Sequence, residues 1–174
     1  MNIIMNFPQN QEIWRAVDGF INYEISSHGR ARNAITGKIM KPTLNKGYLR
    51  ICLMKDKKKH NILIHRMIAI AFVENKDPEN RIYIDHIDNN KLNNSCLNLR
   101  WATSEENNHN LSISKRNTSG YKGVSFYKKL NKWRCKVANQ HVGLFKTKEE
   151  AAQAYNDKAL ELFGEFVKLN VIEE

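Results

Sequence analysis

Cysteines are few in this sequence, and they are scattered. Only three of the 174 residues are cysteine, namely Cys52, Cys96 and Cys135, and no two of them form a Cys-x-x-Cys pair. Structural zinc sites and disulfide frameworks both depend on cysteines at short, paired spacings. The sequence therefore argues against zinc and against disulfide bonds, and we expect each cysteine to be a small, partly buried residue in a reducing compartment.

Long apolar runs are also missing. No apolar stretch approaches the roughly 18 residues that a membrane-spanning helix needs, and the chain does not open with a basic segment followed by an apolar one. The mean hydropathy of −0.60 indicates small hydrophobic cores. We expect a soluble, intracellular protein with no membrane partner, located in the cytoplasm or nucleus of a host cell if a phage or virus encodes it.

Acidic residues are outnumbered by basic ones. The chain has 28 Lys and Arg against 18 Asp and Glu, which gives a formal net charge of +10. The bias is sharpest between Lys115 and Lys136, where eight basic residues and no acidic one occur. Because neutralisation of phosphate dominates nucleic-acid affinity, this excess predicts a polyanionic partner, of which double-stranded DNA is one. The alternative for the basic stretch is an ordinary solvated surface.

The predicted fold is of the α+β class, in three segments. The first, residues 10–60, has short alternating runs broken by glycine, which predict strands and hairpins, with the lysines of residues 55–59 at a hairpin tip. The second, residues 61–112, predicts an apolar helix over 65–72, a strand over 82–84, an Asn-rich loop over 88–95, and a strand over 97–102. A capping box at Thr103-x-x-Glu106 then starts a helix.

The third segment follows a polar linker at residues 113–119. Residues 120–171 predict a separate three-stranded antiparallel sheet, with strands over 121–129, 132–139 and 141–145. A second capping box, Thr147-x-x-Glu150, opens a helix that runs through Phe163 and ends at Gly164. Small residues recur along this helix, so it is expected to lie close on the sheet.

Four polar residues in the second segment have the chemistry that phosphodiester hydrolysis requires. Asp85 and the amide oxygen of Asn107 are hard oxygen ligands for a divalent cation, with Mg²⁺ preferred and Mn²⁺ as the alternative. A neutral His86 is a suitable general base. Asn98 can accept from the Nδ1–H of His86, which would leave Nε2 for the water. Taken singly, each of these residues is more often plain polar surface.

The motifs that contain these residues resemble the HNH homing endonucleases of phages and introns. They are His65-Arg66, Asp85-His86-Ile87-Asp88-Asn89-Asn90-Lys91-x-Asn93-Asn94, Asn98-Leu99-Arg100-Trp101-Ala102-Thr103, and Asn107 with Asn110. The last letter of the triad is Asn107 rather than histidine, as in a subgroup of the family. The resemblance implies a ββα-metal (His-Me finger) core with one Mg²⁺-like ion on Asp85 and Asn107, His86 as the base and Asn98 as its orienter.

Two further features go with that resemblance. Residues 12–53 look like the small modular segment that often precedes this nuclease core. Arg66 matches a family position and is expected to contact phosphate or to support the structure, whereas His65 is expected to be structural.

Residues 119–170 resemble the APETALA-type (ethylene-response-factor) DNA-binding domain. The matching motifs are Ser119-x-Tyr121-Lys122-Gly123-Val124, Lys132-Trp133, Gly143-x-Phe145-x-Thr147-x-Glu149-Glu150-Ala151-Ala152-x-Ala154-Tyr155, and Lys168-Leu169-Asn170. That family lays its sheet in the major groove of DNA. The candidate DNA contacts of this segment are Lys122, Lys128, Lys132, Trp133, Arg134 and Lys136, although a core role for Trp133 is an equal alternative. Ser125 stands where the family usually has a base-reading arginine, so the family's target sequence does not transfer.

The leading hypothesis is a metal-dependent, site-specific DNA endonuclease with a C-terminal major-groove-binding module. The alternative is a non-catalytic, sequence-specific DNA-binding protein with a degenerate nuclease core. A third, a non-specific protective or toxin nuclease, is disfavoured by the attached recognition module. The sequence leaves open the DNA target, nicking against double-strand cleavage, and whether the protein is a monomer or a dimer.

Overall fold

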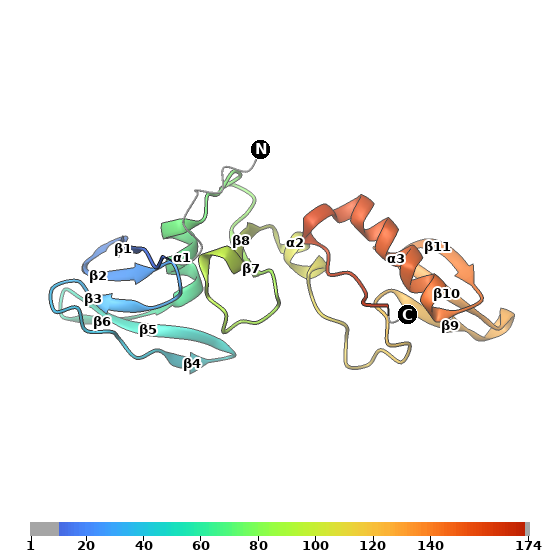
Figure 1. The fold of residues 1–174 in the computed structure, drawn as a ribbon, viewed down its shortest axis with the longest axis horizontal. Coiled ribbons are helices and arrows are strands. Elements are labelled where there is room, and N and C mark those ends of the chain that lie inside the picture. Colours follow the sequence, from blue (N-terminus) through green and yellow to red (C-terminus); the bar gives the residue numbers. More distant parts are fainter. Residues whose placement is uncertain (1–10, 173–174) are drawn as a thin grey trace. The chain divides into compact units, whose positions relative to one another are not determined.

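The computed structural model describes residues 11–172, so residue 10, where the first segment was predicted to begin, lies outside the described part. The chain divides into two compact units, one up to Thr103 and the other from Ser104 (Figure 1). The predicted domain boundaries lay near residues 60 and 112. Each unit is described by itself.

The first unit begins with two small antiparallel sheets. The first sheet has the order β1-β2-β3, and the second has the order β4-β5-β6. Their bounds are Trp14–Val17 for β1, Phe20–Ser26 for β2, Ala31–Asn33 for β3, Thr43–Asn45 for β4, Tyr48–Lys55 for β5 and Lys58–Leu63 for β6.

The predicted hairpin tip at the lysine run is confirmed. Asp56 and Lys57 join β5 to β6 with φ values of 51° and 62°, so both residues of the turn are left-handed. Lys46 and Gly47 join β4 to β5 in the same way, with φ values of 48° and 83°. Two left-handed residues match the twist of the flanking strands, which is why two-residue hairpins favour this turn.

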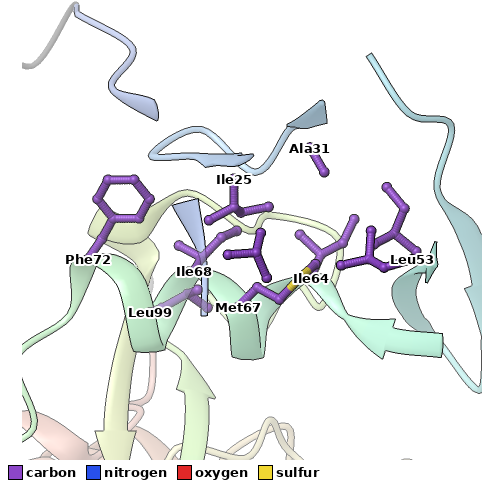
Figure 2. Close-up of a cluster of buried hydrophobic side chains, with 10 residues drawn as sticks. Ile25, Ala31, Leu53, Ile64, Met67, Ile68, Phe72 and Leu99 are labelled. Carbon is purple, nitrogen blue, oxygen red and sulfur yellow. The ribbon is translucent and has the colours of Figure 1, made fainter. Parts of the chain in front are cut away.

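Helix α1 (Ile64–Phe72) follows β6 directly and supplies four of the ten buried residues of this unit's core. Its buried apolar residues recur on one face and pack against β2, β3, β5 and β8, as Figure 2 shows for Ile25, Ala31, Leu53, Ile64, Met67, Ile68, Phe72 and Leu99. Strands on one side of the predicted boundary at residue 60 therefore share one core with the helix on the other side. A pattern of local periodicity does not reveal such long-range packing.

A two-stranded antiparallel sheet carries the Asp-His pair. Strand β7 (Tyr83–His86) pairs with β8 (Leu99–Ala102), and Asp85 lies opposite Arg100. Asp85 and His86 are thus the last two residues of β7, at the end of the predicted strand. Asn98 lies in a short 3-10 turn, η1 (Cys96–Asn98), instead of on the predicted strand. The next helix, α2 (Ser104–His109), begins one residue after Thr103, at the predicted place.

The second unit contains α2 and a three-stranded antiparallel sheet in the order β11-β10-β9. The strands are β9 (Val124–Tyr127), β10 (Lys132–Val137) and β11 (Gln140–Phe145), with the turn η2 (Lys128–Leu130) between the first two. Helix α3 (Lys148–Phe163) packs on the sheet and is followed by η3 (Gly164–Phe166). The predicted sheet and helix are confirmed, including the capping box of Thr147 and Glu150 and the end of the helix at Gly164.

Part of the predicted linker is fixed in this unit. Ser119 is buried, and its hydroxyl oxygen lies 2.9 Å from each of the carbonyl oxygens of Tyr121 and Val124, either of which can accept its proton. Asn117 also donates through its side chain to the Tyr121 carbonyl oxygen at 2.9 Å. The three cysteines are free thiols, and no helix within residues 11–172 has the length and apolar character to cross a bilayer.

The packing of α3 on the sheet predicts a strong effect of Gly123→Ala. Gly123 has a φ of 75°, and a Cβ at this position would overlap the ring of Tyr155. Left-handed backbone costs about 1–2 kcal/mol in a residue with a Cβ, and overpacking adds about 1–3 kcal/mol. We expect a clearly lower thermal midpoint for the second unit, measured by circular dichroism.

The matched control is Gly120→Ala. Gly120 has a φ of 83°, but a Cβ there would meet nothing within 4 Å. This variant should therefore show the backbone cost alone. Equal destabilisation by the two substitutions would contradict the tight contact between Gly123 and Tyr155.

Candidate functional site

Asp85 is a buried carboxylate held by an arginine across the β7–β8 pair. Its side chain accepts at Oδ2 from Nε of Arg100 at 2.8 Å and lies 2.7 Å from the Nη2 atom of the same guanidinium. Asp85 is only 4% exposed, and a buried charge needs a charged or hydrogen-bonded partner. The pair fixes the carboxylate in place.

His86 is also buried, and one of its ring nitrogens is held by Asn94. Its Nε2 lies 3.1 Å from the amide oxygen Oδ1 of Asn94. The amide nitrogen of Asn94 donates to the carbonyl oxygen of Leu92 at 3.3 Å, which turns Oδ1 toward the imidazole. Because an amide oxygen only accepts, Nε2 carries the proton and Nδ1 of the neutral ring carries the lone pair. The contact in the structure is thus at Nε2 with Asn94, whereas the expected one was at Nδ1 with Asn98.

Asn98 ties together the loop that carries Asn94. Its amide oxygen accepts from the backbone N–H of Asp88 at 3.1 Å. Its amide nitrogen donates to Oδ1 of Asp88 at 2.9 Å and to the carbonyl oxygen of Asn93 at 2.8 Å. The backbone of Asn98 also accepts from the N–H of Ile87 at 2.9 Å. Asn98 thus links both ends of the loop, while Asn94 is the acceptor at Nε2 of His86.

Asp88 is the anionic centre of the same loop. Burial alone would raise the pKa of its carboxyl group, but hydrogen bonds from the Asn93 side chain, the Asn90 backbone and the Asn98 side chain outweigh burial and lower the pKa. The carboxylate oxygens lie 2.7 Å from the Asn90 nitrogen and 2.7 Å from Nδ2 of Asn93. An ionised Asp88 therefore keeps the loop closed.

Two aromatic side chains pack beside the His86 ring. His65 of α1 contacts it edge-on, with ring centroids 5.3 Å apart, and Tyr48 of β5 lies 5.0 Å from His65 and 6.2 Å from His86. The Nζ of Lys91 stands 4.4 Å over the Tyr48 ring. Burial, with the charges of His86, Arg66 and Lys91 adding to it, lowers the pKa of His65 to about 4. His65 is therefore neutral at pH 7.

Asn107, the second predicted metal ligand, is a half-buried residue of α2 in the second unit. Among residues 11–172 there is no group of three or more His, Cys, Asp and Glu side chains that would hold a metal by itself. The chemistry of the two predicted ligands, one carboxylate and one amide oxygen, fits Mg²⁺, which usually takes one or two carboxylates and completes its shell with substrate phosphate and water.

The predicted DNA contacts of the second unit separate into three groups. Lys132 and Lys136 are exposed on β10, and the half-buried Arg134 lies between them on the same face, where its guanidinium stands 5.5 Å from the centre of the Tyr127 ring. Lys128 is exposed in η2. By contrast, Trp133 packs against the hydrophobic cluster under α3, and the ammonium group of Lys122 donates to backbone carbonyl oxygens.

In the first unit, Arg66 is exposed on α1. Its Nη1 approaches the carbonyl oxygen of Ile82 at 3.5 Å, so the side chain reaches from the helix toward the start of β7. This position is compatible with either of the roles expected for it.

Several residues around His86 were not predicted from the sequence. Asp88 and Asn94 belong to the quoted motif, but the Asn-rich stretch was interpreted only as a turn-forming loop. The available signal was the density of Asx residues, since such side chains bind nearby backbone as well as one another. Arg100 and Tyr48 gave no local signal, because each reaches its partner through strand pairing or long-range packing.

Comparisons with known proteins show which families this chain is similar to. Residues 12–54 match the NUMOD4 motif. An uncharacterised HNH endonuclease of Acanthamoeba polyphaga mimivirus is 43% identical over 113 residues, which is 63% of this chain and 58% of that protein. The DNA endonuclease I-HmuI of Bacillus phage SP01 is 37% identical over 99 residues, which is 56% of each chain.

A solved structure adds to these similarities. It describes DNA binding and cleavage by the HNH homing endonuclease I-HmuI, and it matches with a TM-score of 0.51 and 36% identity over 55% of each chain. These findings support the HNH homing endonuclease family. The chain spans 26%, 34% and 58% of the lengths of three mimivirus relatives, so each of them extends well beyond the aligned part.

The buried His65 predicts a loss of stability in mild acid. An unfolded histidine takes up a proton near pH 6.5, whereas folded His65 does so only at about pH 4. The unfolded chain thus binds more protons between these values, and stability falls as the pH drops from 6.5 to 4, by roughly 3 kcal/mol at most.

Urea unfolding at a series of pH values measures this effect. His65→Phe should remove most of the loss in that window, because the variant has nothing to protonate there. The control, His28→Phe, changes an exposed histidine and should keep the wild-type profile. An unchanged profile in His65→Phe would show that His65 is not the group responsible.

Proposed function

We propose that this chain is a metal-dependent, site-specific DNA endonuclease of the homing HNH type that hydrolyses phosphodiester bonds. The observation that carries the proposal is the buried His86, whose Nε2 is engaged by Asn94 beside the fixed carboxylate of Asp85. This arrangement combines an imidazole base and a hard oxygen ligand at consecutive positions of β7. The similarity to I-HmuI supports the same conclusion.

In the proposed reaction, Nδ1 of His86 takes a proton from the attacking water. The bond to Asn94 keeps the ring in the tautomer that can do so, and it stabilises the imidazolium that forms because Nε2–H remains a donor. Asp85 and Asn107 would hold a divalent cation, Mg²⁺ with Mn²⁺ as the alternative. When bound, this cation supplies charge neutralisation at the phosphate and support for the departing 3′ oxygen.

The second unit would hold the DNA, as an APETALA-type module. Lys132, Arg134 and Lys136 share one face of β10, opposite the face that packs against α3, so three cationic groups lie along one strand. Such a strand suits the phosphates and base edges of a major groove. The module would extend the footprint of a nuclease core that is too small to select a site alone. Trp133 is omitted from the proposed contacts because it packs in the core.

Incubation with supercoiled plasmid and a DNA library tests the proposal. Nicked or linear product should appear with Mg²⁺ or Mn²⁺ and disappear with EDTA, and sequencing of the ends should show a preferred site. No product with any divalent ion, together with tight binding to DNA, would favour the alternative of a non-catalytic DNA-binding protein. Cleavage without site preference would contradict the homing type.

His86→Ala should reduce the rate of cleavage by roughly 10²–10⁴-fold, because the general base is lost. Affinity for DNA, measured by fluorescence anisotropy in EDTA, should be nearly unchanged. His28→Ala replaces an exposed histidine in the same unit and serves as the control. A loss of binding as large as the loss of cleavage would contradict the role assigned to His86.

The combined change Lys132→Ala and Lys136→Ala should weaken binding and lower its dependence on salt. Each phosphate that the protein no longer neutralises reduces the slope of log affinity against log salt by about 0.9. Lys158→Ala is the control, since Lys158 pairs with Glu161 on α3. A slope equal to that of the wild type would show that this face of β10 does not touch DNA.

A further inference from the structure

Lys122 directs its charge inward, onto the end of helix α2. Its Nζ donates to the carbonyl oxygen of His109 at 2.5 Å and to that of Leu111 at 3.0 Å. His109 is the last residue of α2, so the ammonium group meets the carbonyl groups that a helix leaves unsatisfied at its C-terminal end. Burial, and then the charge of Lys168, lower the pKa of Lys122, as expected for an ammonium group withdrawn from water.

Helix α2 depends on such contacts for its position. It has six residues, and helices shorter than about 12–15 residues are marginal in water on their own. Three other contacts of the second unit secure the same end. The His109 ring stacks on Phe163 with centroids 3.6 Å apart, the backbone N–H of Lys168 donates to the His109 carbonyl oxygen at 3.4 Å, and Nζ of Lys168 lies 3.1 Å from Oγ of Ser112.

The backbone of Lys122 is itself held rigidly. Its N–H donates to Oδ1 of Asn170 at 2.6 Å, and its carbonyl oxygen accepts from Nδ2 of the same residue at 3.1 Å. The next residue, Gly123, packs against the ring of Tyr155 of α3. Lys122 therefore links the β9–β11 sheet and α3 to α2. Its backbone is fixed beside the sheet, and its four-carbon side chain reaches the C-terminal end of α2.

We propose that Lys122 is a positioning residue, which fixes α2 and hence the proposed ligand Asn107 that the helix carries. This inference rests on the proposed function, because the contact of Lys122 with α2 matters for metal binding only if Asn107 is a metal ligand. It also changes the role of the C-terminal module. The module holds a helix of the nuclease in place, in addition to any contact that it makes with DNA.

The predicted role of Lys122 as a direct DNA contact is the competing interpretation. To bind phosphate, the ammonium group would have to leave the carbonyl oxygens of His109 and Leu111. Among the contacts described above, no other cationic group donates to these two oxygens. The exposed Lys129 of η2, by contrast, needs no such change. The two roles therefore predict different results for the same substitution.

Lys122→Met tests the proposal in the full-length chain, because methionine keeps much of the length and removes the charge and the donors. Without metal, hydrogen exchange should become faster in the amides of α2 but not in those of β7 and β8. With DNA, the Mg²⁺ concentration for half-maximal cleavage should rise by roughly 10–100-fold, the range for residues that support a metal ligand. Affinity for DNA in EDTA should stay close to that of the wild type.

Lys129→Met is the matched control, and it should leave both the exchange of α2 and the Mg²⁺ requirement unchanged. Lys122→Arg keeps a cationic donor and should restore most of both properties. If Lys122→Met does not fold, Lys122→Gln, which keeps an N–H donor without the charge, is measured in its place against the same criteria.

Two results would overturn the inference: α2 exchange equal to that of the wild type, or a loss of DNA affinity with an unchanged Mg²⁺ requirement. Failure of the proposed function is distinguishable from either. A wild-type chain that cleaves nothing with any divalent ion would remove the nuclease assignment. The hydrogen-exchange comparison would then still decide whether Lys122 fixes α2.

Discussion

The hydrogen bond between Asn94 and Nε2 of His86 decides which nitrogen of the imidazole is basic, and the surrounding structure serves to keep it in place. Asn94 lies in a loop that has no regular secondary structure, so its position has to come from side chains. Asp88 and Asn98 close the loop through the bonds between them. If either bond were lost, the amide of Asn94 would be free to turn, and the tautomer of His86 would no longer be fixed.

The N-terminal sheet supports the same loop from outside. The backbone N–H of Cys96 donates to the carbonyl oxygen of Ser27 at 2.8 Å, which joins the end of the loop to the turn after β2. A Cβ on Gly29, whose φ is 92°, would lie 3.2 Å from both Cβ and the carbonyl oxygen of Asn94, so the two backbones approach closely. Tyr48 adds a contact beside the His86 ring. The segment that matches the NUMOD4 motif is thus a structural part of the site.

Burial and ion pairing set the charges near the His86 ring. His65 is buried and neutral at pH 7, and Asp85 is paired with Arg100, while the charged Lys91 and the ionised Asp88 lie in the same part of the unit. Further positive charge lies on the exposed face of β10, at Lys132 and Lys136, and at the hairpin tip of Lys57. In the proposed reaction, substrate attraction and proton abstraction would therefore be carried by different groups.

Features of the chain with a local cause were predictable from the sequence. The capping box at Thr147, the end of α3 at Gly164 and the hairpin tip at the lysine run follow from short-range rules that act within a few residues. The Asp85-His86 pair was found by its residue types.

The shared core of α1 and the N-terminal strands, and the inward direction of Lys122, were not found. These misses have a common cause. Periodicity in the sequence describes the environment of a single helix or strand. The packing of Ile64 with Leu53, and the hydrogen bond from Lys122 to His109, join elements that meet only in the folded chain. The partner of the His86 ring was not identified for the same reason, because several asparagines near His86 in the sequence are equivalent candidates until the loop is closed.

Nitrogen-15 NMR of the His86 imidazole, assigned by comparison with His86→Ala, tests the central claim most directly. At pH 8, without metal or DNA, the ring should be the neutral tautomer with the proton on Nε2, and Nδ1 should show the shift of an unprotonated nitrogen. In Asn94→Ala, this preference should weaken toward a mixture of tautomers. A ring protonated at Nδ1 in the wild-type protein would contradict the account.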